Sequence, residues 1–342
     1  MNILFLSRLF HPHIGGVETH VLELSKELIK KGHTVTLITE GYDETLKDFQ
    51  TFQGITIYRI PLWEVNQESK KFAIWEWLGR HKQLLKSADV IHVHDVVYWL
   101  FPFFYFSQKI FITYHGYEGS TSPTLSAKIQ RRMGEWMARK TINVGGFMKK
   151  WYGSHPDMIL YGAVRPAPKL AKTKQAIYIG RLHPDTGIMT YLTALRILKQ
   201  KGIEVKLDVF GAGPQQSQAK SYVEKYRLSV HFHGATVNAG HKISAYRFAF
   251  VSRYLTILEA MSAGVPVFAV YDHPIKLDYL TCHPQSEAMT VSDDPAKLAT
   301  ALVKAMKPSE DQKLKTLRAQ AWAVKQTWLS LTRRYLQLWQ SA

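Results

Sequence analysis

The chain has 342 residues, of which 46% are hydrophobic and 21% charged, and it contains one cysteine, Cys282. This composition excludes a disordered chain, and the length exceeds what one hydrophobic core usually serves, so two domains are expected. The lone cysteine excludes an intramolecular disulfide and a multi-cysteine metal site, which fits a reducing compartment such as the cytoplasm. The formal net charge of +17 predicts an anionic partner: nucleotide phosphates, acidic lipid or nucleic acid.

No segment of the sequence has the length of a membrane span. The amino-terminal apolar stretch is interrupted at Arg8, which is too early for a signal-peptide core. The longest apolar run, residues 96–106, has 11 residues and includes Pro102, whereas a helix that crosses a bilayer needs about 20.

The first half of the chain alternates short runs rich in β-branched residues with segments of helical spacing. In residues 18–32, for example, Val21, Leu24 and Leu28 fall on one helical face. Strands that alternate with helices predict parallel βαβ units and a doubly wound sheet. The predicted strands of this half are residues 2–7, 33–39, 54–60, 89–95 and 109–116.

After a polar, proline-bearing stretch at residues 165–174, which is typical of a linker, the same pattern starts again. The predicted strands of the second half lie within residues 176–182, 205–214, 230–236, 248–252, 265–272 and 287–292. We therefore expect two α/β domains, residues 1–165 and 166–342. A long helical segment at residues 310–340, with Trp322, Trp328 and Trp339, is expected to pack back on the first domain.

Ligands bind outside the carboxyl ends of the strands in open parallel sheets, so the loops at those ends are the candidate ligand sites. Gly15 and Gly16 follow the first strand and allow an anion to approach the start of a helix, although a tight turn alone also explains them. His115 ends another strand, where a structural histidine is the alternative to a catalytic one. His92 and His94 are two apart, but no third ligand for a metal is recognisable near them.

The second half presents three such loops. Arg181 follows one strand, and Asp185, Thr186 and Gly187 begin the next helix. Another strand exit contains Gly211 and Gly213. A helix that begins near residues 254–256 carries Glu259 about one turn further in. Helix amides can hold a diphosphate while a carboxylate accepts hydrogen bonds from a ribose diol, which predicts a nucleotide site.

Six ordered motifs extend this pattern: "GGVE", "HVHD", "YHG", "GRLHPDTG", "VFGAGP" and "LTILEAMSAGVPV". Together they resemble glycosyltransferase family 4, over nearly the whole chain. The resemblance implies the GT-B fold, with two facing Rossmann-like domains and a cleft between them. It also implies a metal-independent, retaining transfer of a sugar from a nucleotide-sugar, which is a substrate rather than a cofactor, to an acceptor hydroxyl.

The resemblance also implies roles for individual residues. Gly15, Gly16 and Gly211 approach the donor, Arg181 neutralises its diphosphate, and the amides of Leu255, Thr256 and Ile257 cap it. His115 contacts the donor sugar and Glu259 the ribose, so these two are the candidate catalytic residues.

Two positions depart from the family pattern. Val251 stands where a first glutamate is common, and Thr186 stands where a lysine is common. Ser252 and Tyr254 also replace glycines of the turn before the helix. We expect Arg253, in this turn, to supply the missing positive charge; the alternative is a solvated arginine.

The acceptor is less clearly marked in the sequence. Residues 96–165 contain nine Lys and Arg but three Asp and Glu, and residues 126–140 place Ile129, Met133, Trp136 and Met137 on one helical face. This pattern predicts contact with an anionic membrane through residues 96–150, at the inner face of the cell membrane, and a lipid-linked acceptor. A helix that buries this stripe in its own domain, and a soluble glycan acceptor, are the alternatives.

Two other classes of function stay open. A sugar-nucleotide or glycan-binding protein that has lost catalysis would explain Val251 and Thr186. A nucleic-acid binder would explain the charge, but the sequence has no helix-turn-helix, RNA-recognition motif or zinc finger, so no nucleic-acid partner is expected.

Overall fold

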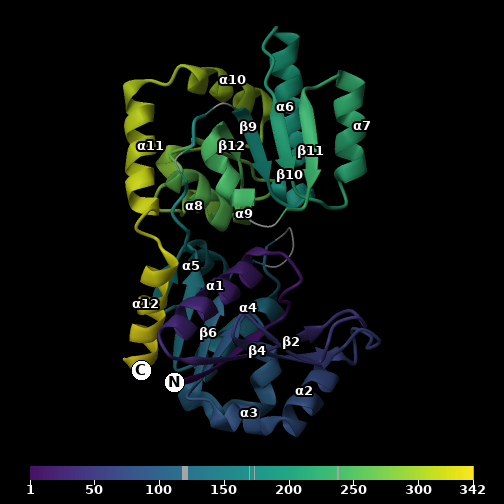
Figure 1. Cartoon of the computed structure of the whole chain (residues 1–342), viewed down its shortest axis with the longest axis vertical. Coiled ribbons are helices and arrows are strands. Elements are labelled where there is room, and N and C mark those ends of the chain that lie inside the picture. Colours follow the sequence, from purple (N-terminus) through teal and green to yellow (C-terminus); the bar gives the residue numbers. More distant parts are fainter. Residues whose placement is uncertain (118–121, 169, 173, 237–238, 342) are drawn as a thin grey trace. The chain divides into compact units, whose positions relative to one another are not determined.

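A computed structural model describes residues 1–117, 122–168, 170–172, 174–236 and 239–341. The chain divides into two compact units (Figure 1). The first unit contains residues 1–117, 123–160 and 328–341, and the second unit consists mainly of residues 161–327.

The first unit is built on an eight-stranded sheet in the order β3-β4-β2-β1-β5-β6-β7-β8. All neighbours pair in parallel except β3 and β4, which form an antiparallel pair at the edge. The strands are β1 (Asn2–Ser7), β2 (Thr34–Gly41), β3 (Phe49–Phe52), β4 (Ile55–Pro61), β5 (Val90–His94), β6 (Ile110–Tyr114), β7 (Lys140–Val144) and β8 (Met158–Leu160).

Helices and one long 3₁₀ segment connect these strands. They are α1 (Gly16–Lys30), α2 (Lys70–Arg80), α3 (Lys82–Ser87), η1 (Val97–Lys109), α4 (Leu125–Met137) and α5 (Phe147–Tyr152). The predicted face of α1 is buried, with Val21, Leu24 and Leu28 fully enclosed. The apolar run at residues 96–106 lies in η1, where Pro102 removes a backbone donor and prevents a regular α-helix.

The second unit has a six-stranded, fully parallel sheet in the order β11-β10-β9-β12-β13-β14. Its strands are β9 (Lys174–Ile179), β10 (Leu207–Phe210), β11 (Val230–Gly234), β12 (Tyr246–Phe250), β13 (Val267–Ala269) and β14 (Met289–Val291). Its helical elements are η2 (Pro184–Thr186), α6 (Ile188–Gln200), α7 (Gln216–Tyr226), η3 (Ala239–Ala245), α8 (Tyr254–Ser262), α9 (Pro274–Thr281), η4 (Ser286–Ala288), α10 (Pro295–Met306) and α11 (Glu310–Ala323).

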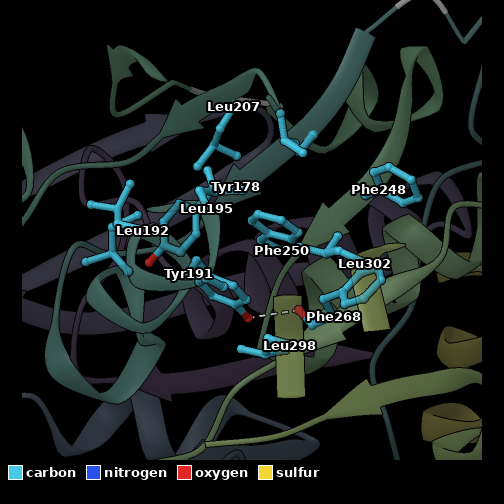
Figure 2. Close-up of a cluster of buried hydrophobic side chains, with 14 of the residues drawn as sticks. Tyr178, Tyr191, Leu192, Leu195, Leu207, Phe248, Phe250, Phe268, Leu298 and Leu302 are labelled. Atoms are coloured by element: carbon cyan, nitrogen blue, oxygen red, sulfur yellow. Dashed lines mark hydrogen bonds between the residues drawn. The ribbon is translucent and has the colours of Figure 1, made fainter. Parts of the chain in front are cut away.

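The core of the second unit lies between its sheet and α6, whose apolar residues recur at helical spacing. Tyr191 of α6 stacks on Phe250 at 4.8 Å between ring centroids, and its hydroxyl donates to the carbonyl of Phe268 at 2.8 Å (Figure 2). These contacts fix the carboxyl end of β12, because Phe250 is its last residue.

The prediction of two α/β units with mainly parallel sheets is confirmed. The terminal segment corrects the prediction of one long helix, because it forms α11 and a separate α12 (Trp328–Gln340). Between them the amide of Val164 donates to the carbonyl of Gln326 at 2.8 Å, and Thr327 makes a β-bridge with Val164. Helix α11 ends at Ala323, and this bridge separates it from α12. Helix α12 belongs to the first unit, where it lies beside α1 (Figure 1).

Candidate functional site

The strand orders place a topological switch point in each sheet, where neighbouring connections leave in opposite directions. In the first unit it lies between β1 and β5, and in the second unit between β9 and β12. The predicted site loops follow these four strands and two of their neighbours, β6 before His115 and β10 before Gly211. Each unit therefore presents candidate residues where an open α/β sheet binds its ligands.

In the second unit, Asp185 gathers the positive charges of two loops. It accepts from Arg181 Nη2 at 3.0 Å and from Arg253 Nη2, and it contacts His183 Nδ1 at 2.8 Å. Burial alone would raise the pKa of Asp185, but the guanidinium groups of Arg253 and Arg181 outweigh burial and hold the pKa below its usual value. Arg253 is therefore not the solvated arginine of the alternative interpretation, because its side chain is only 32% exposed and forms an ion pair with Asp185.

A third basic side chain, Lys276 of α9, lies behind the same turn and was not predicted from the sequence. Its side chain is fully buried, and Nζ donates to the carbonyl of Ser252 and lies 4.5 Å from the ring centroid of Tyr279. Burial holds the pKa of Lys276 well below its usual value. Helix α9 has little amphipathic pattern, so the sequence does not indicate that Lys276 is buried.

Thr186, which replaces the lysine common in the family, is used inside its own loop. Its hydroxyl donates to the backbone carbonyls of Arg181 and His183. The hydroxyl of Ser252 in turn donates to the carbonyl of Thr186 at 3.4 Å. Val251 is buried at the end of β12 and its amide donates to the carbonyl of Phe268, so this position faces the core.

The amino-terminal turn of α8 offers fewer free amides than predicted. The amide of Tyr254 donates to the hydroxyl of Tyr279 at 2.7 Å. The amide of Ile257 donates to the carbonyl of Arg253 at 2.9 Å, so Ile257 is corrected from a capping group to part of the helix. Within the described residues, the amides of Leu255 and Thr256 have no hydrogen-bond partner. Two backbone donors are thus available beside Arg253.

Glu259 lies further along α8 with its carboxylate against the backbone of Gly240. A Cβ atom added at Gly240 would lie 2.2 Å from Cδ of Glu259. In the part of the chain that the structure describes, the carboxylate has no hydrogen-bond or ion-pair partner, and burial raises the pKa of Glu259 to about 7. It is a part-buried acceptor that is available to a ligand hydroxyl.

Gly211 has a structural reason that does not involve a ligand. A Cβ atom there would lie 1.8 Å from the carbonyl oxygen of Gly180, and one at Gly213 would lie 2.5 Å from that of Leu182. The glycines allow the ends of β9 and β10 to approach, and this holds Arg181 next to the β10 loop.

In the first unit, the carboxylate of Glu18 lies against the backbone at the start of α1. A Cβ atom at Gly15 would lie 2.2 Å from Oε2 of Glu18, whereas one at Gly16 would meet no atom within 4 Å. Oε1 of Glu18 contacts Nδ1 of His13 at 3.1 Å. Burial raises the pKa of Glu18. The backbone at Gly16 is therefore open to close approach, while Gly15 lies under Glu18.

His115 lies in a cluster of histidines at the ends of β5 and β6. Its Nε2 contacts Nδ1 of His94 at 2.8 Å, its amide donates to Asp95 at 2.8 Å, and its ring centroid lies 4.7 Å from that of His20. Burial lowers the pKa of His115 to about 3, and it also lowers the pKa of His20, His92 and His94. The imidazoles are therefore neutral at physiological pH. Among the described residues, no three potential ligands are placed to hold a metal ion.

Helix α4 exposes its apolar stripe. Leu125, Ile129, Met133 and Trp136 are 73%, 50%, 43% and 79% exposed, whereas Met137 is buried. The side that faces the unit instead contains Arg131. The expectation of one stripe is thus corrected at Met137, and the alternative of a stripe buried in its own domain is excluded for the other residues.

Arg131 is enclosed between two aromatic rings. Its Cζ lies 4.2 Å from the ring centroid of Tyr114 and 3.8 Å from that of Tyr152, and Nη2 donates to the carbonyl of Gly116 at 3.3 Å. Cation–π contacts satisfy this buried charge and turn the apolar side of α4 outward.

Two further features bear on the ligand. No helix within the described residues is both long and apolar enough to cross a membrane. A cavity of about 480 Å³ opens at the amino ends of β9, β10 and β11, lined by residues that include Ala176, Leu207 and Val230. It lies at the opposite end of the sheet from Arg181 and Arg253, so it is not the predicted ligand site.

Two family models match the chain. Residues 14–155 match the model described as Glycosyltransferase Family 4, and residues 164–321 match the model described as Glycosyl transferases group 1. Together the two models account for most of the chain.

Curated relatives match over a shorter stretch. The chain is 30% identical over 95 residues to the GPI3 subunit of phosphatidylinositol N-acetylglucosaminyltransferase from Saccharomyces cerevisiae. The matched residues are 27% of this chain and 21% of that protein. Over 107 residues it is 31% identical to an uncharacterized glycosyltransferase of Methanocaldococcus jannaschii, or 28% of this chain and 25% of that protein. The chain thus matches about a fifth to a quarter of the length of these relatives.

Solved structures resemble the whole chain. Sucrose-phosphate synthase from Thermosynechococcus elongatus has a TM-score of 0.77 at 18% identity, covering 99% of this chain and 98% of that chain. Anabaena Alr3699/HepE in complex with UDP and glucose has a TM-score of 0.71 at 14% identity, covering 99% of both chains. At such identities the likeness shows the fold, and it confirms the predicted GT-B fold.

Proposed function

Because the chain belongs to glycosyltransferase family 4, we propose that it moves a sugar from a nucleotide-sugar of the UDP or GDP type to a hydroxyl group of a glycan or a lipid-linked acceptor. The proposed reaction retains the configuration of the anomeric carbon. It is a hexosyl transfer that serves polysaccharide or glycolipid synthesis.

The observation that supports the donor site best is the arrangement around one turn of the second unit. Arg181 and Arg253 meet at Asp185, the amides of Leu255 and Thr256 are unpaired, and Glu259 follows on the same helix. A diphosphate matches the guanidinium groups and amides, and a ribose diol matches the carboxylate.

In the proposed reaction, the bond between the anomeric carbon and the diphosphate oxygen breaks, and its electron pair stays on the diphosphate. The acceptor oxygen bonds to the anomeric carbon on the same face and gives its proton to a diphosphate oxygen. Arg181, Arg253 and the two amides stabilise the charge that develops on the leaving group. His115, a neutral imidazole, contacts the donor sugar.

We propose that the transfer is independent of metal. The positive charge that a divalent cation would bring to the diphosphate is supplied in this chain by Arg181 and Arg253. This arrangement also offsets the loss of a cation at Thr186. Added chelator is therefore expected to leave donor binding unchanged.

The relatives support the classes of donor and acceptor. The Anabaena structure contains UDP and glucose, and the yeast relative is named for an N-acetylglucosaminyltransferase of phosphatidylinositol. A UDP-sugar donor and a lipid-linked acceptor are therefore the first pair to try.

A second candidate function is a sugar-nucleotide or glycan-binding protein without turnover. Val251 provides no carboxylate at the end of β12, and the hydroxyl of Thr186 is used within its own loop. Both observations remove groups that the family commonly uses, while the diphosphate-binding groups remain.

The deciding experiment measures thermal stabilisation of the protein by a panel of UDP-, GDP-, ADP- and TDP-sugars. Glu259→Ala is compared with Glu224→Ala, an exposed glutamate of α7 in the same unit. We expect one donor to raise the melting temperature of the wild type and of Glu224→Ala but not of Glu259→Ala. If no donor stabilises the wild type, the donor site proposed here is wrong.

Turnover separates the two candidate functions. The stabilising donor is incubated with the protein and lipid-linked or glycan acceptors, and release of the nucleoside diphosphate is measured. Release that depends on the acceptor supports the transferase. Tight donor binding with no release for any acceptor supports the binding protein.

We also propose that the exposed face of α4 contacts an anionic membrane at the cytoplasmic side. Leu125, Ile129, Met133 and Trp136 form the apolar stripe, and basic side chains border it: Lys128, Arg132 and Arg139, all exposed. Apolar insertion combined with basic flanks is the pattern of an interfacial helix. This peripheral contact would place the protein beside a lipid-linked acceptor.

Co-sedimentation with lipid vesicles tests this contact. We expect binding to vesicles that contain an anionic phospholipid and little binding to neutral phosphatidylcholine vesicles. Trp136→Ala should weaken binding, whereas Trp63→Ala, a 40% exposed tryptophan of the same unit, should not. Equal loss in both variants, or binding that ignores lipid charge, would contradict the proposal.

A further inference from the structure

Helix α12 places two side chains among the strand ends of the first unit. Tyr335 is fully buried and Trp339 is 6% exposed, and both contact side chains of β5 and β6. Nε1 of Trp339 donates to Nδ1 of His92 at 3.0 Å. The helix therefore contributes hydrogen bonds as well as apolar packing.

The indole fixes the protonation of His92. An indole N–H is a donor only, so Nδ1 of His92 is the acceptor and carries no proton. His92 is therefore neutral with its proton on Nε2, which agrees with burial lowering its pKa. That Nε2–H donates to the hydroxyl oxygen of Thr113 at 2.7 Å.

The next two bonds have one consistent direction. The hydroxyl of Thr113 lies 2.9 Å from the hydroxyl of Tyr335, which lies 3.0 Å from Nε2 of His20. If Thr113 donates to Tyr335, Tyr335 donates to Nε2 of His20, and the protons of both hydroxyl groups have acceptors. In the reverse direction, the proton of Thr113, whose side chain is fully buried, has no acceptor among the described residues. An unpaired buried donor costs about 1–3 kcal/mol, so the first direction is favoured.

The chain of hydrogen bonds therefore ends on His20 as an acceptor at Nε2. His20 is 4% exposed and burial lowers its pKa, so it is neutral and its proton is on Nδ1. Its ring meets the ring of His115 edge-on, at 80° and 4.7 Å between centroids. Because the two rings are in contact, a change in the tautomer or the ring position of His20 changes the packing of His115.

We propose that α12 positions His115 through a one-way hydrogen-bond chain, from Trp339 through His92, Thr113 and Tyr335 to His20. Tyr335 is thus a positioning residue for the sugar-contacting histidine, although it touches no substrate. The role assigned to His115 rests on the proposed function, whereas the direction of the chain and the tautomers do not.

The first arm of the test observes the tautomers by nuclear magnetic resonance of the full chain with ¹⁵N-labelled histidine. Signals are assigned with single His→Gln variants. We expect His92 to carry its proton on Nε2 and His20 on Nδ1. Tyr335→Phe removes the last donor, and Thr113→Val breaks the chain from a different element; each should give His20 a mixture of tautomers.

Tyr114→Phe is the matched control. It removes another buried phenol hydroxyl of the same unit, one that donates to the carbonyl of Arg131 at 3.2 Å and lies outside the chain of hydrogen bonds. We expect Tyr114→Phe to leave the His20 tautomer unchanged. A wild-type His20 with its proton on Nε2, or an unchanged His20 tautomer in both chain variants, would overturn the inference.

The second arm measures donor turnover with the nucleotide-sugar that stabilises the wild type. Tyr335→Phe should lower kcat about tenfold with little change in the donor KM, because positioning and not donor affinity is lost. Tyr114→Phe should keep both. A shifted tautomer with full kcat would overturn the positioning role. If the wild type binds no donor, the proposed function fails, and the tautomer arm still decides the direction of the chain.

Discussion

Arg253 is the residue whose role the structure sharpens most, because Asp185 holds it beside Arg181. Asp185 orders the two guanidinium groups but can neutralise only one of them. The pair therefore keeps a net positive charge, which matches the diphosphate of the proposed donor.

Arg253→Ala is expected to weaken nucleoside diphosphate binding about tenfold to a hundredfold, much as Arg181→Ala should. A hydrogen bond to a charged group contributes about 1.5–3 kcal/mol, which corresponds to this range. Isothermal titration calorimetry measures it, with Arg247→Ala, an exposed arginine of the same unit, as control. Unchanged affinity in Arg253→Ala would show that this arginine does not serve the donor.

Glu259 is expected to make donor affinity depend on pH. Its pKa of about 7 means that the carboxylate is ionised at pH 8 and protonated at pH 6. If the ionised form binds the ribose hydroxyls, affinity for a nucleotide-sugar should be about tenfold weaker at pH 6 than at pH 8. Glu259→Gln should bind weakly at both values, and a wild-type affinity that is the same at pH 6 and 8 would contradict this role.

The raised pKa of Glu259 also makes the stability of the unliganded protein depend on pH. Burial raises the pKa of Glu259 in the folded state above its value in the unfolded chain. The resulting contribution to the free energy of unfolding is fully present at a pH below the unfolded pKa. This contribution is lost as the pH rises through about 7. Glu259→Gln should therefore raise the melting temperature at pH 8 more than at pH 5.

At this scale the sequence predicted the loops but not every partner. Arg181, Arg253 and Glu259 follow strand ends, and the strand pattern located them. Lys276 was missed because its amine reaches Ser252 across 24 positions of sequence, a tertiary contact with no periodic signal. The engagement of Ile257, and the carboxylate of Glu18 over Gly15, likewise depend on local geometry.

Among the elements, α4 shows what periodicity can and cannot predict. The spacing of Ile129, Met133 and Trp136 identifies a stripe, but it does not say whether that stripe faces the core or the outside. The rings of Tyr114 and Tyr152, from two other elements, decide this by enclosing Arg131. Strands β3, β7 and β8 are absent from the predicted set. All three are short, β3 and β7 mix polar and apolar residues, and β3 and β8 pair only at the two edges of the sheet.

Arg131→Met is expected to destabilise the first unit by about 2 kcal/mol, since it removes two cation–π contacts and a hydrogen bond. Urea unfolding measures the change. Arg132→Met, which loses a surface ion pair with Glu135, should stay within about 1 kcal/mol of the wild type. Equal unfolding free energies for the two variants would show that the buried guanidinium contributes nothing specific.

On the scale of the whole molecule, the two units are not successive halves of the sequence. The first unit takes its final helix, α12, from beyond the second unit. The sequence pattern predicted two α/β domains, but it could not predict the break between α11 and α12, because the Val164–Thr327 bridge joins distant segments.

Removal of residues 328–342 is expected to loosen the first unit near its amino terminus. The deletion exposes apolar surface of α1 and leaves His20, His92 and Thr113 without Tyr335 and Trp339. Hydrogen exchange should show faster exchange in α1 and β5, with the sheet of the second unit unchanged. Unchanged protection in α1 would mean that α12 contributes little to the stability of this unit.

The interleaved path of the chain also governs the order of events during protein synthesis. The ribosome completes every strand of the second unit before it makes α12, so the first unit emerges early but lacks one helix throughout that interval. Domains generally fold as they emerge, the amino-terminal one first. This chain departs from that order, because the first unit cannot be completed until α12 is made. The side of α1 that α12 covers stays exposed until the second unit has been synthesised. A nascent-chain chaperone would therefore find its binding surface on the part of the protein that was made first.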